Sequence, residues 1–153
     1  MRYLPEGVMS AEQVQAFITE HLVASTAFAA ILPAEERLIG HVTFHPWYAA
    51  GTYEIGWVFH PKYHGQGYAT EAATALCAYG FETLGLRRII ATCQPENVAS
   101  RRIMEKLGMQ REAHFRKVFA VDETTWLDEY LYAMLEEEWW ASAEERSHPD
   151  TDR

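Results

Sequence analysis

The first part of the chain has the pattern of a helix followed by short strands. Apolar residues at helical spacing are Val14, Phe17, Ile18 and Leu22. Ser10 and Gln13 precede them with the spacing of a capping box, so we expect a helix over residues 11–24. Three extended apolar runs follow, at Ala27–Leu32, Leu38–Phe44 and Thr52–His60. The short turn segments between these runs predict an antiparallel meander.

After Pro61 the spacing becomes helical again. Gly65 and Gly67 open this stretch, and one face of the predicted helix carries Ala69, Ala72, Ala73, Leu76 and Tyr79. The short apolar run Arg88–Cys93 then predicts a strand. A strand, a helix and a second strand in this order indicate a parallel crossover, unlike the meander before it.

The last part of the chain adds a helix and two strands. Asn97 is a typical N-cap and Gly108 a typical C′ residue, so we expect a helix over Val98–Leu107. Strands of about Met109–Ala120 and Trp126–Leu135 flank a polar turn. The predicted fold is α/β (α+β), with an antiparallel N-terminal meander followed by a parallel strand-helix-strand crossover in one mixed sheet.

Length and composition are those of a single globular domain, with 153 residues of which 48% are hydrophobic. We expect the domain to cover residues 1–145 and a disordered tail to cover residues 146–153. No apolar run approaches the ~20 residues of a membrane helix, and the first residues lack the apolar core of a signal peptide. The two cysteines, Cys77 and Cys93, are too few for a disulfide framework, so we expect a cytoplasmic protein.

Charge narrows the choice of partner. The chain has 13 Lys and Arg against 22 Asp and Glu, a net charge of −9. A nucleic-acid-binding surface needs clustered basic residues, so nucleic acid is not an expected partner. The acidic excess is compatible with a cationic partner such as an amine, or with solubility alone.

The glycine-rich turn after Thr52–His60 is the most informative stretch for chemistry. A strand delivers Gly65 and Gly67 directly to the start of a helix. Glycines allow the backbone to approach a ligand closely, and the N–H groups of the first helical turn are unsatisfied donors. Together with the helix dipole they predict a site for an anion such as a pyrophosphate, although a tight turn without a ligand also explains two glycines. A dinucleotide fingerprint would need a third glycine where Thr70 stands, and no P-loop motif is present.

Three stretches resemble the GNAT superfamily of N-acetyltransferases, most closely the RimJ/RimL-like branch that acetylates ribosomal-protein N-termini. They are residues 54–72, Asn97–Met109 and Asp128–Met134, and the resemblance covers roughly residues 2–140. It implies a GNAT fold and transfer of an acetyl group from acetyl-CoA to a primary amine. The acceptor would be a protein or peptide N-terminus or a small-molecule amine, and no metal is implied.

The resemblance also implies how CoA is held. The family motif Gln/Arg-x-x-Gly-x-Gly/Ala falls on His64, Gly67 and Ala69, and the main-chain N–H groups of residues 65–69 would bind the pyrophosphate. His64 departs from the usual Gln or Arg, so we expect altered affinity rather than lost function. The main chain of the preceding strand would pair with the pantetheine arm. The implied cofactor-binding residues are Val58, Phe59, His60, His64, Gly65, Gln66, Gly67, Tyr68, Ala69, Thr70, Asn97 and Ser100.

Amine acetylation needs a base, because an alkyl ammonium with a pKa near 10.4 cannot attack a thioester, and an acid for the departing thiolate. Glu54 is the first candidate base, since the resemblance places its strand beside the acyl group, and Tyr132 is the matching candidate acid. Asp128 and Ser100 are second choices for base and acid. An exposed strand carboxylate and a core aromatic are the structural alternatives for Glu54 and Tyr132.

Other features are better explained by packing than by chemistry. The histidine pairs His41/His45 and His60/His64 lack the Cys, Asp and Glu neighbours of a metal site. Cys77 lies in an alanine-rich helix and is expected to be buried without catalytic function. A non-catalytic acyl-CoA-binding sensor is the alternative function, because it would need the same loop but no acid and base.

The resemblance also raises an expectation about assembly. The opening residues resemble the loop that follows a first strand and helix in family members, and this sequence has no counterpart of those two elements. Ala27–Leu32 would then form an apolar sheet edge, which is a template for pairing with another chain. We therefore expect a homo-oligomer, such as a dimer; a trimmed start of the sequence is the alternative explanation.

Overall fold

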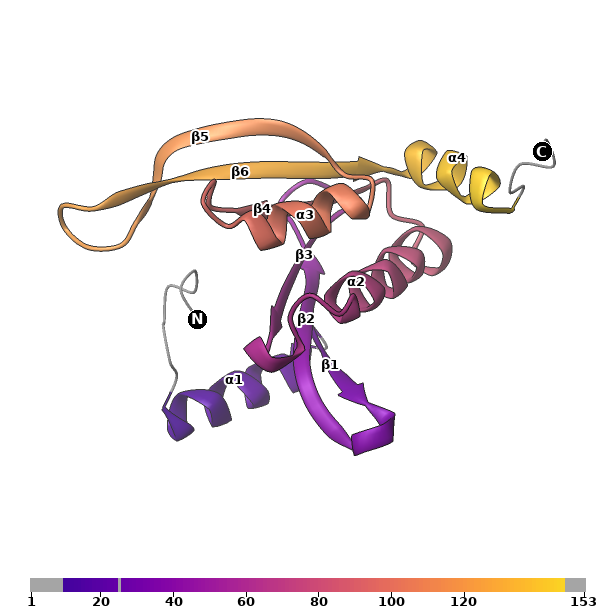
Figure 1. The fold of residues 1–153 in the computed structure, drawn as a ribbon. Coiled ribbons are helices and arrows are strands. Elements are labelled where there is room, and N and C mark those ends of the chain that lie inside the picture. The colour runs from indigo at the N-terminus through magenta and orange to yellow at the C-terminus, as the bar shows by residue number, and fades with distance from the viewer. Residues whose placement is uncertain (1–9, 25, 148–153) are drawn as a thin grey trace.

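A single mixed sheet organises the computed structural model, which describes residues 10–24 and 26–147 (Figure 1). The elements are α1 (Ala11–Ala24), β1 (Ala27–Leu32), β2 (Arg37–Pro46), β3 (Thr52–Phe59), α2 (Tyr68–Ala78), β4 (Arg88–Cys93), α3 (Val98–Lys106), β5 (Gln110–Ala120), β6 (Trp126–Leu135) and α4 (Glu136–Ser147). The six strands lie in the order β1-β2-β3-β4-β6-β5, and β3–β4 is the parallel pair among them. The predicted fold class, with its antiparallel meander and parallel crossover, is confirmed.

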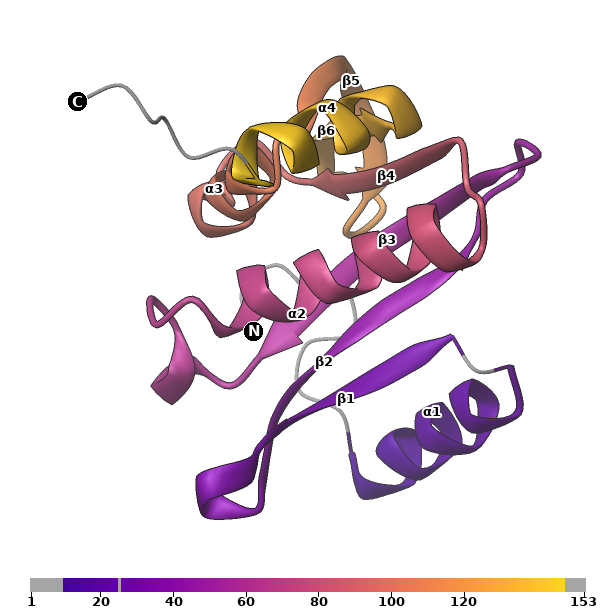
Figure 2. The same ribbon diagram turned by 90° about the vertical axis from the view of Figure 1, so that its right-hand side faces the viewer.

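The parallel pairing of β3 with β4 is short. It joins Thr52 to Arg88, Tyr53 to Ile89 and Glu54 to Ile90, and it ends there. Beyond this point β3 stays paired with β2 as far as Phe59, whereas β4 follows β6. The two strands therefore diverge, and Figure 2 shows the gap that opens between their ribbons behind α2.

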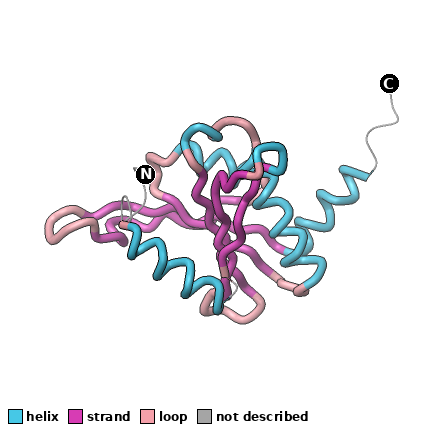
Figure 3. The backbone as a smooth tube through the Cα atoms, turned by 90° about the horizontal axis from the view of Figure 1, so that it is seen from below, coloured by secondary structure: helices cyan, strands magenta, loops and turns pink. Residues whose placement is uncertain are grey.

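The two faces of the sheet differ in character. The main core lies on the face covered by α2 and includes Ile55, Ala73, Cys77, Ile89, Ala91, Met104 and Met134. A second, smaller cluster on the other face consists of Ile90, Leu131 and Ala133 with Trp47 and Ala113 packed against it. Helix α1 lies on the opposite side of the sheet from α2 (Figure 3). Because side chains alternate along a strand, consecutive residues of β3, β4 and β6 face these two different environments.

Helix α2 changes its geometry at its C-terminal end. Ala73 and Cys77 are buried as predicted, but a π-helix covers Tyr79–Thr83, closed by a hydrogen bond from Leu84 N–H to Tyr79 O (3.0 Å). Tyr79 still follows the α-helical spacing of Ala73 and Cys77, which turns it away from the buried face, so it is 41% exposed and its predicted place on the inner face is wrong. Phe81 is buried instead and stacks on Trp139 with ring centroids 5.7 Å apart.

Helices α3 and α4 show what capping signals could and could not predict. Asn97 caps α3 by accepting a hydrogen bond from Ser100 N–H (3.1 Å), as expected. Helix α4 was not predicted, although its three successive glutamates suit a helix N-terminus and Glu138 accepts a bond from Leu135 N–H (2.9 Å). It includes the first two positions of the predicted tail; residues 148–153 lie outside the described residues, and so does the opening segment 1–9.

Strand β1 lies at one edge of the described sheet. Ile31 on this strand and Leu38 on its neighbour are 60% and 64% exposed. An exposed apolar edge agrees with the reason for expecting self-association, which stays a prediction.

The different burial of Phe81 and Tyr79 predicts different losses of stability when each is replaced by alanine. Phe81→Ala should lower the free energy of unfolding by about 3–5 kcal/mol, because it leaves a cavity in the core beside Trp139. Tyr79→Ala should cost less than about 1 kcal/mol, because a large part of this side chain is already in water. Urea denaturation of both variants measures the difference in the free energy of unfolding. Equal losses would contradict the burial of Phe81 and the exposure of Tyr79.

Candidate active site

The glycine-rich turn forms a shallow anion-binding shape at the start of α2. A short helix at Pro61–Tyr63 follows β3, and Gly65 and Gly67 then have φ angles of +71° and +84°. Side chains other than glycine rarely adopt such angles. A Cβ atom built on either glycine would meet nothing within 4 Å, so the turn faces open space. A ligand can therefore approach the main chain there without a side chain in the way.

The main-chain donors of this turn are free. In the described part of the chain, Glu71 N–H bonds to Gly67 O (2.9 Å), whereas the N–H groups of residues 65–70 donate to no main-chain oxygen. Unsatisfied donors at a helix N-terminus are the usual partners of phosphate oxygens. The predicted pyrophosphate loop therefore has the hydrogen-bonding capacity that its chemistry requires.

His64 holds the turn against the end of β3. Its ring Nε2–H donates to Phe59 O (2.8 Å). Gln66 adds a second tie, because its side-chain amide donates to Lys62 O (3.0 Å). These two bonds hold the turn against the end of β3 and the short helix that follows it. His64 thus contributes through its ring to the loop's shape, a role that the sequence pattern did not reveal.

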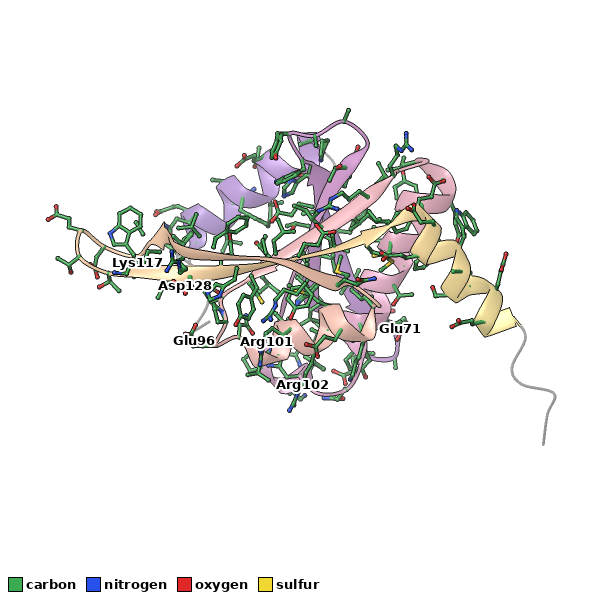
Figure 4. The ribbon with its side chains drawn as sticks, turned by 90° about the horizontal axis from the view of Figure 1, so that it is seen from above. Glu71, Glu96, Arg101, Arg102, Lys117 and Asp128 are labelled. Carbon is green, nitrogen blue, oxygen red and sulfur yellow. The ribbon has the colours of Figure 1, made fainter. Side chains whose placement is uncertain are left out.

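A groove of about 520 Å³ begins at the turn and runs between α2 and α3. It is lined by Gly67, Thr70, Glu71, Thr74, Ala75 and Lys106. Lys106 places a positive charge at one wall, and Glu71 places a negative charge at the other. Figure 4 shows Glu71 together with Arg101 and Arg102, the two arginines of α3.

The main chain of β3 offers hydrogen bonds to the gap at alternate residues. His60 N–H donates to Ile39 O (2.9 Å), so it is engaged with β2 and not available to a ligand, which corrects part of the predicted pantetheine contact. By strand alternation, Val58 turns its main chain toward β2 as well, while Trp57 and Phe59 turn theirs toward β4. Phe59 therefore stays a candidate contact through its N–H group, because its carbonyl oxygen accepts from His64, and Trp57 takes the place of Val58 and His60.

Glu54 lies on the sheet face opposite α2, at the last residue pair before β3 and β4 diverge. Thr92 Oγ1 on β4 donates to Glu54 Oε1 over 3.4 Å. Glu129 on β6, a residue that the sequence motifs did not single out, lies near both Thr92 and Glu54. Burial raises the pKa of Glu129 above the ordinary glutamate value, and the neighbouring charge of Glu54 raises it further, whereas the Thr92 hydroxyl opposes these effects. Two carboxylates therefore lie on either side of one hydroxyl.

Tyr132 lies on the other face of the sheet, in the main core under α3. Burial raises the pKa of its phenol, with a smaller contribution from Glu105, so the group is a proton donor at neutral pH. Ser100 lies on α3 near the same face, with its N–H bonded to Asn97. The structure thus brings the two candidate acids to one face of the sheet and Glu54 to the other, at the point where β3 and β4 diverge.

Asp128 has a structural role. On the β5–β6 hairpin, Arg116, Lys117 and Val118 oppose this single residue in a bulge, and Lys117 has a φ of +50°. The carboxylate accepts from Lys117 N–H (2.8 Å) and from His114 Nε2 (2.7 Å), so both oxygens are engaged (Figure 4). The Lys117 bond, followed by that from His114, holds the pKa of Asp128 below its usual range. A carboxylate with a lowered pKa is a weak base, which argues against the second-choice assignment.

The buried cysteines are chemically quiet. Burial raises the pKa of Cys77 to about 12 and that of Cys93 to about 11, so neither is a thiolate at neutral pH. The described residues include no group of three or more His, Cys, Asp or Glu side chains that could hold a metal ion. Among the helices that the structure describes, none has the length and apolar character needed to cross a bilayer.

Comparisons with known proteins identify the family to which the chain belongs. A sequence model of the acetyltransferase (GNAT) domain matches residues 1–110. The chain is 50% identical over 140 residues to YnaD of Bacillus subtilis (strain 168), named as an uncharacterized N-acetyltransferase, and the match covers 91% of this chain and 82% of YnaD. The chain belongs to the GNAT family of acetyltransferases. Membership of the GNAT family makes it an acyltransferase and places its glycine-rich turn in a family whose cosubstrate is acetyl-CoA.

Solved structures support the GNAT fold. The crystal structure of a GNAT-family acetyltransferase from Bacillus anthracis is 51% identical, covers 90% of this chain and 82% of its own, and has a TM-score of 0.84. The [ribosomal protein uS5]-alanine N-acetyltransferase of Escherichia coli (strain K12) is a more distant relative, 28% identical over 110 residues, which are 70% of this chain and 56% of that protein. The predicted superfamily is confirmed.

The role assigned to Asp128 predicts a pH-dependent effect on stability. Asp128→Asn should lower the midpoint of thermal unfolding at neutral pH, because an amide cannot accept both bonds of the bulge. A carboxylate with a lowered pKa stabilises the fold above the unfolded-state value of about 3.9, and this contribution is lost as the pH falls. The difference between wild type and variant should therefore shrink between about pH 5 and pH 3. Glu123→Gln, in the exposed turn of the same hairpin, is the control and should show little difference at any pH.

Proposed function

We propose that this protein is an N-acetyltransferase that transfers the acetyl group of acetyl-CoA to a primary amine. The observation that carries the proposal is the glycine-rich turn with its free N–H groups, directly beside the gap between β3 and β4. The pyrophosphate of CoA would accept bonds from the N–H groups of residues 65–69, and Lys106 would lie near the phosphates in the groove. The acceptor class agrees with the distant likeness to a ribosomal-protein N-acetyltransferase of the RimJ/RimL type.

The divergence of β3 from β4 supports the position of the acyl end. A pantetheine arm contains two amides, which pair well with a strand whose main-chain groups are unpaired. Trp57 would supply its N–H and carbonyl groups and Phe59 its N–H group, and the thioester would then lie beside Glu54, where β3 and β4 diverge.

The chemical step divides between the two faces of the sheet. Glu54 would take a proton from the acceptor's ammonium group, and the neutral amine would attack the thioester carbonyl carbon. Loss of the thiolate then forms the amide, and Tyr132, with Ser100 as the second choice, would return a proton to the sulfur. Asn97 would serve by holding the first turn of α3 in place rather than by reacting.

Acetyl-CoA binding is tested by two glycine variants with the same backbone strain. Gly67 and Gly108 have φ angles of +84° and +87°, and a Cβ at either would meet no protein atom within 4 Å. At a hundredfold excess over the dissociation constant, acetyl-CoA should raise the melting temperature of wild type by roughly 5–10 °C. Gly108→Ala should keep this shift and Gly67→Ala should lose it, because the added methyl group occupies the approach of the pyrophosphate.

The thermal-shift experiment separates the proposal from its competitors. NAD should cause a much smaller shift in wild type. Equal shifts with NAD and acetyl-CoA, or a full acetyl-CoA shift in Gly67→Ala, would contradict the assigned site.

Turnover is tested at Glu54. Glu54→Gln should lower the rate of CoA release with an alkylamine by about 10²–10⁴-fold, the usual contribution of a general base, and leave the acetyl-CoA dissociation constant unchanged. Released CoA is measured by its free thiol, and Glu123→Gln serves as the control. Acetyl-CoA binding without CoA release in wild type, across a panel of amines, would instead indicate a non-catalytic acyl-CoA sensor.

A further inference from the structure

Glu129 is a half-buried carboxylate that the mechanism above does not use. Three neighbouring strands bring it together with Glu54 and Thr92, since β3, β4 and β6 lie side by side. Glu54 pairs with Ile90, and Leu131 pairs with Thr92, so all three polar side chains project from the face that carries the smaller apolar cluster. Thr92 Oγ1 donates to Glu54 Oε1 over 3.4 Å, and Glu129 lies close enough to be affected by the same hydroxyl and by the charge of Glu54.

This arrangement has fewer donors than acceptors. A threonine hydroxyl carries one proton and can donate to one carboxylate at a time, whereas an ionised carboxylate only accepts. Neither Glu54 nor Glu129 forms a salt bridge with any described residue. A cationic donor or a proton is therefore needed to satisfy the pair when the site is closed to water.

The surrounding groups do not supply that donor. His45 faces Glu54 across β2, and its Nδ1 approaches Pro46 O at 3.2 Å. Phe115 faces Glu129 across β5, and Arg88, the nearest cation along β4, is paired with Glu112. The smaller cluster adds Trp47, whose ring is of the kind that attracts cations.

We propose that Glu129 acts with Glu54 as one carboxylate pair that receives the acceptor's ammonium group and takes its proton. This inference rests on the proposed function and adds a second residue to its acceptor side. An ammonium group brings three N–H donors, so it can donate to both carboxylates at once, which the single hydroxyl proton of Thr92 cannot do. The pair therefore selects acceptors that arrive as cations, such as alkylamines, over aromatic amines that are neutral at the same pH.

The proton balance of the step is complete. The ammonium group loses one proton to the carboxylate pair, which later releases it to solvent. The neutral nitrogen forms its bond to the carbonyl carbon as the carbon–sulfur bond breaks. Tyr132 gives its proton to the thiolate and is reprotonated by a second proton from the nitrogen. The third proton stays on the product amide, and no further reactant is needed.

The experiment compares Glu129→Gln and Glu129→Asp with wild type and with Glu123→Gln as the surface control. For an alkylamine, Glu129→Gln should lower kcat/KM by about 10- to 100-fold, the effect of losing a hydrogen bond to a charged group, mainly through KM. Its acid limb of kcat/KM should move to lower pH, because the variant lacks Glu129, the carboxylate whose pKa is raised by burial and by the charge of Glu54. Glu129→Asp should recover part of the lost kcat/KM and part of the pH shift. With an aromatic amine as acceptor, Glu129→Gln should change kcat/KM by less than about threefold.

The outcomes distinguish this inference from the proposed function. Wild-type CoA release together with an unshifted acid limb in Glu129→Gln would overturn the carboxylate pair alone. Equal losses for the alkylamine and the aromatic amine would do the same, because they would indicate a structural role. No CoA release from wild type with any amine would overturn the proposed function and the carboxylate pair together.

Discussion

The early end of the parallel pairing between β3 and β4 is the constraint on which the site depends. After the pair formed by Glu54 and Ile90, β3 follows β2 and β4 follows β6. Unpaired main-chain groups inside a sheet are costly unless something bonds to them. The divergence therefore leaves the last part of β3 without a strand partner on its β4 side, on the strand that leads to the free N–H groups of the turn before α2. A long ligand with an anionic part and an amide-containing arm fits both features at once.

The same divergence explains why chemistry can be shared between two faces. Side chains of β3, β4 and β6 alternate between the core under α2 and α3 and the smaller cluster opposite. A closed sheet would keep Glu54 and Tyr132 apart. A thioester held between the diverging strands, as proposed, would contact a carboxylate from one side and a phenol from the other. The acid in the core has its pKa raised by burial, which suits a group that must hold its proton until the thiolate leaves.

Local signals predicted much of the fold and the whole glycine-rich turn. Ser10, Asn97 and Gly108 marked helix ends, because capping depends on residues close in sequence. What depends on distant contacts was missed. The packing of Phe81 on Trp139 joins α4 to the segment after α2, and the bulge held by Asp128 depends on bonds across the hairpin. Glu129 carries no motif, and its meeting with Glu54 through Thr92 requires the strand order of the folded sheet.

The most direct test of the opening as the cofactor site is amide hydrogen exchange with and without acetyl-CoA. Trp57 and Phe59 direct their N–H groups to the gap, whereas His60 N–H is already bonded to Ile39 O and Val58 faces β2. Exchange at Trp57 and Phe59 should slow by at least about tenfold when acetyl-CoA binds, while Val58 and His60 change little. Equal protection of all four amides, or protection confined to the β5–β6 hairpin, would contradict a pantetheine arm bound between β3 and β4.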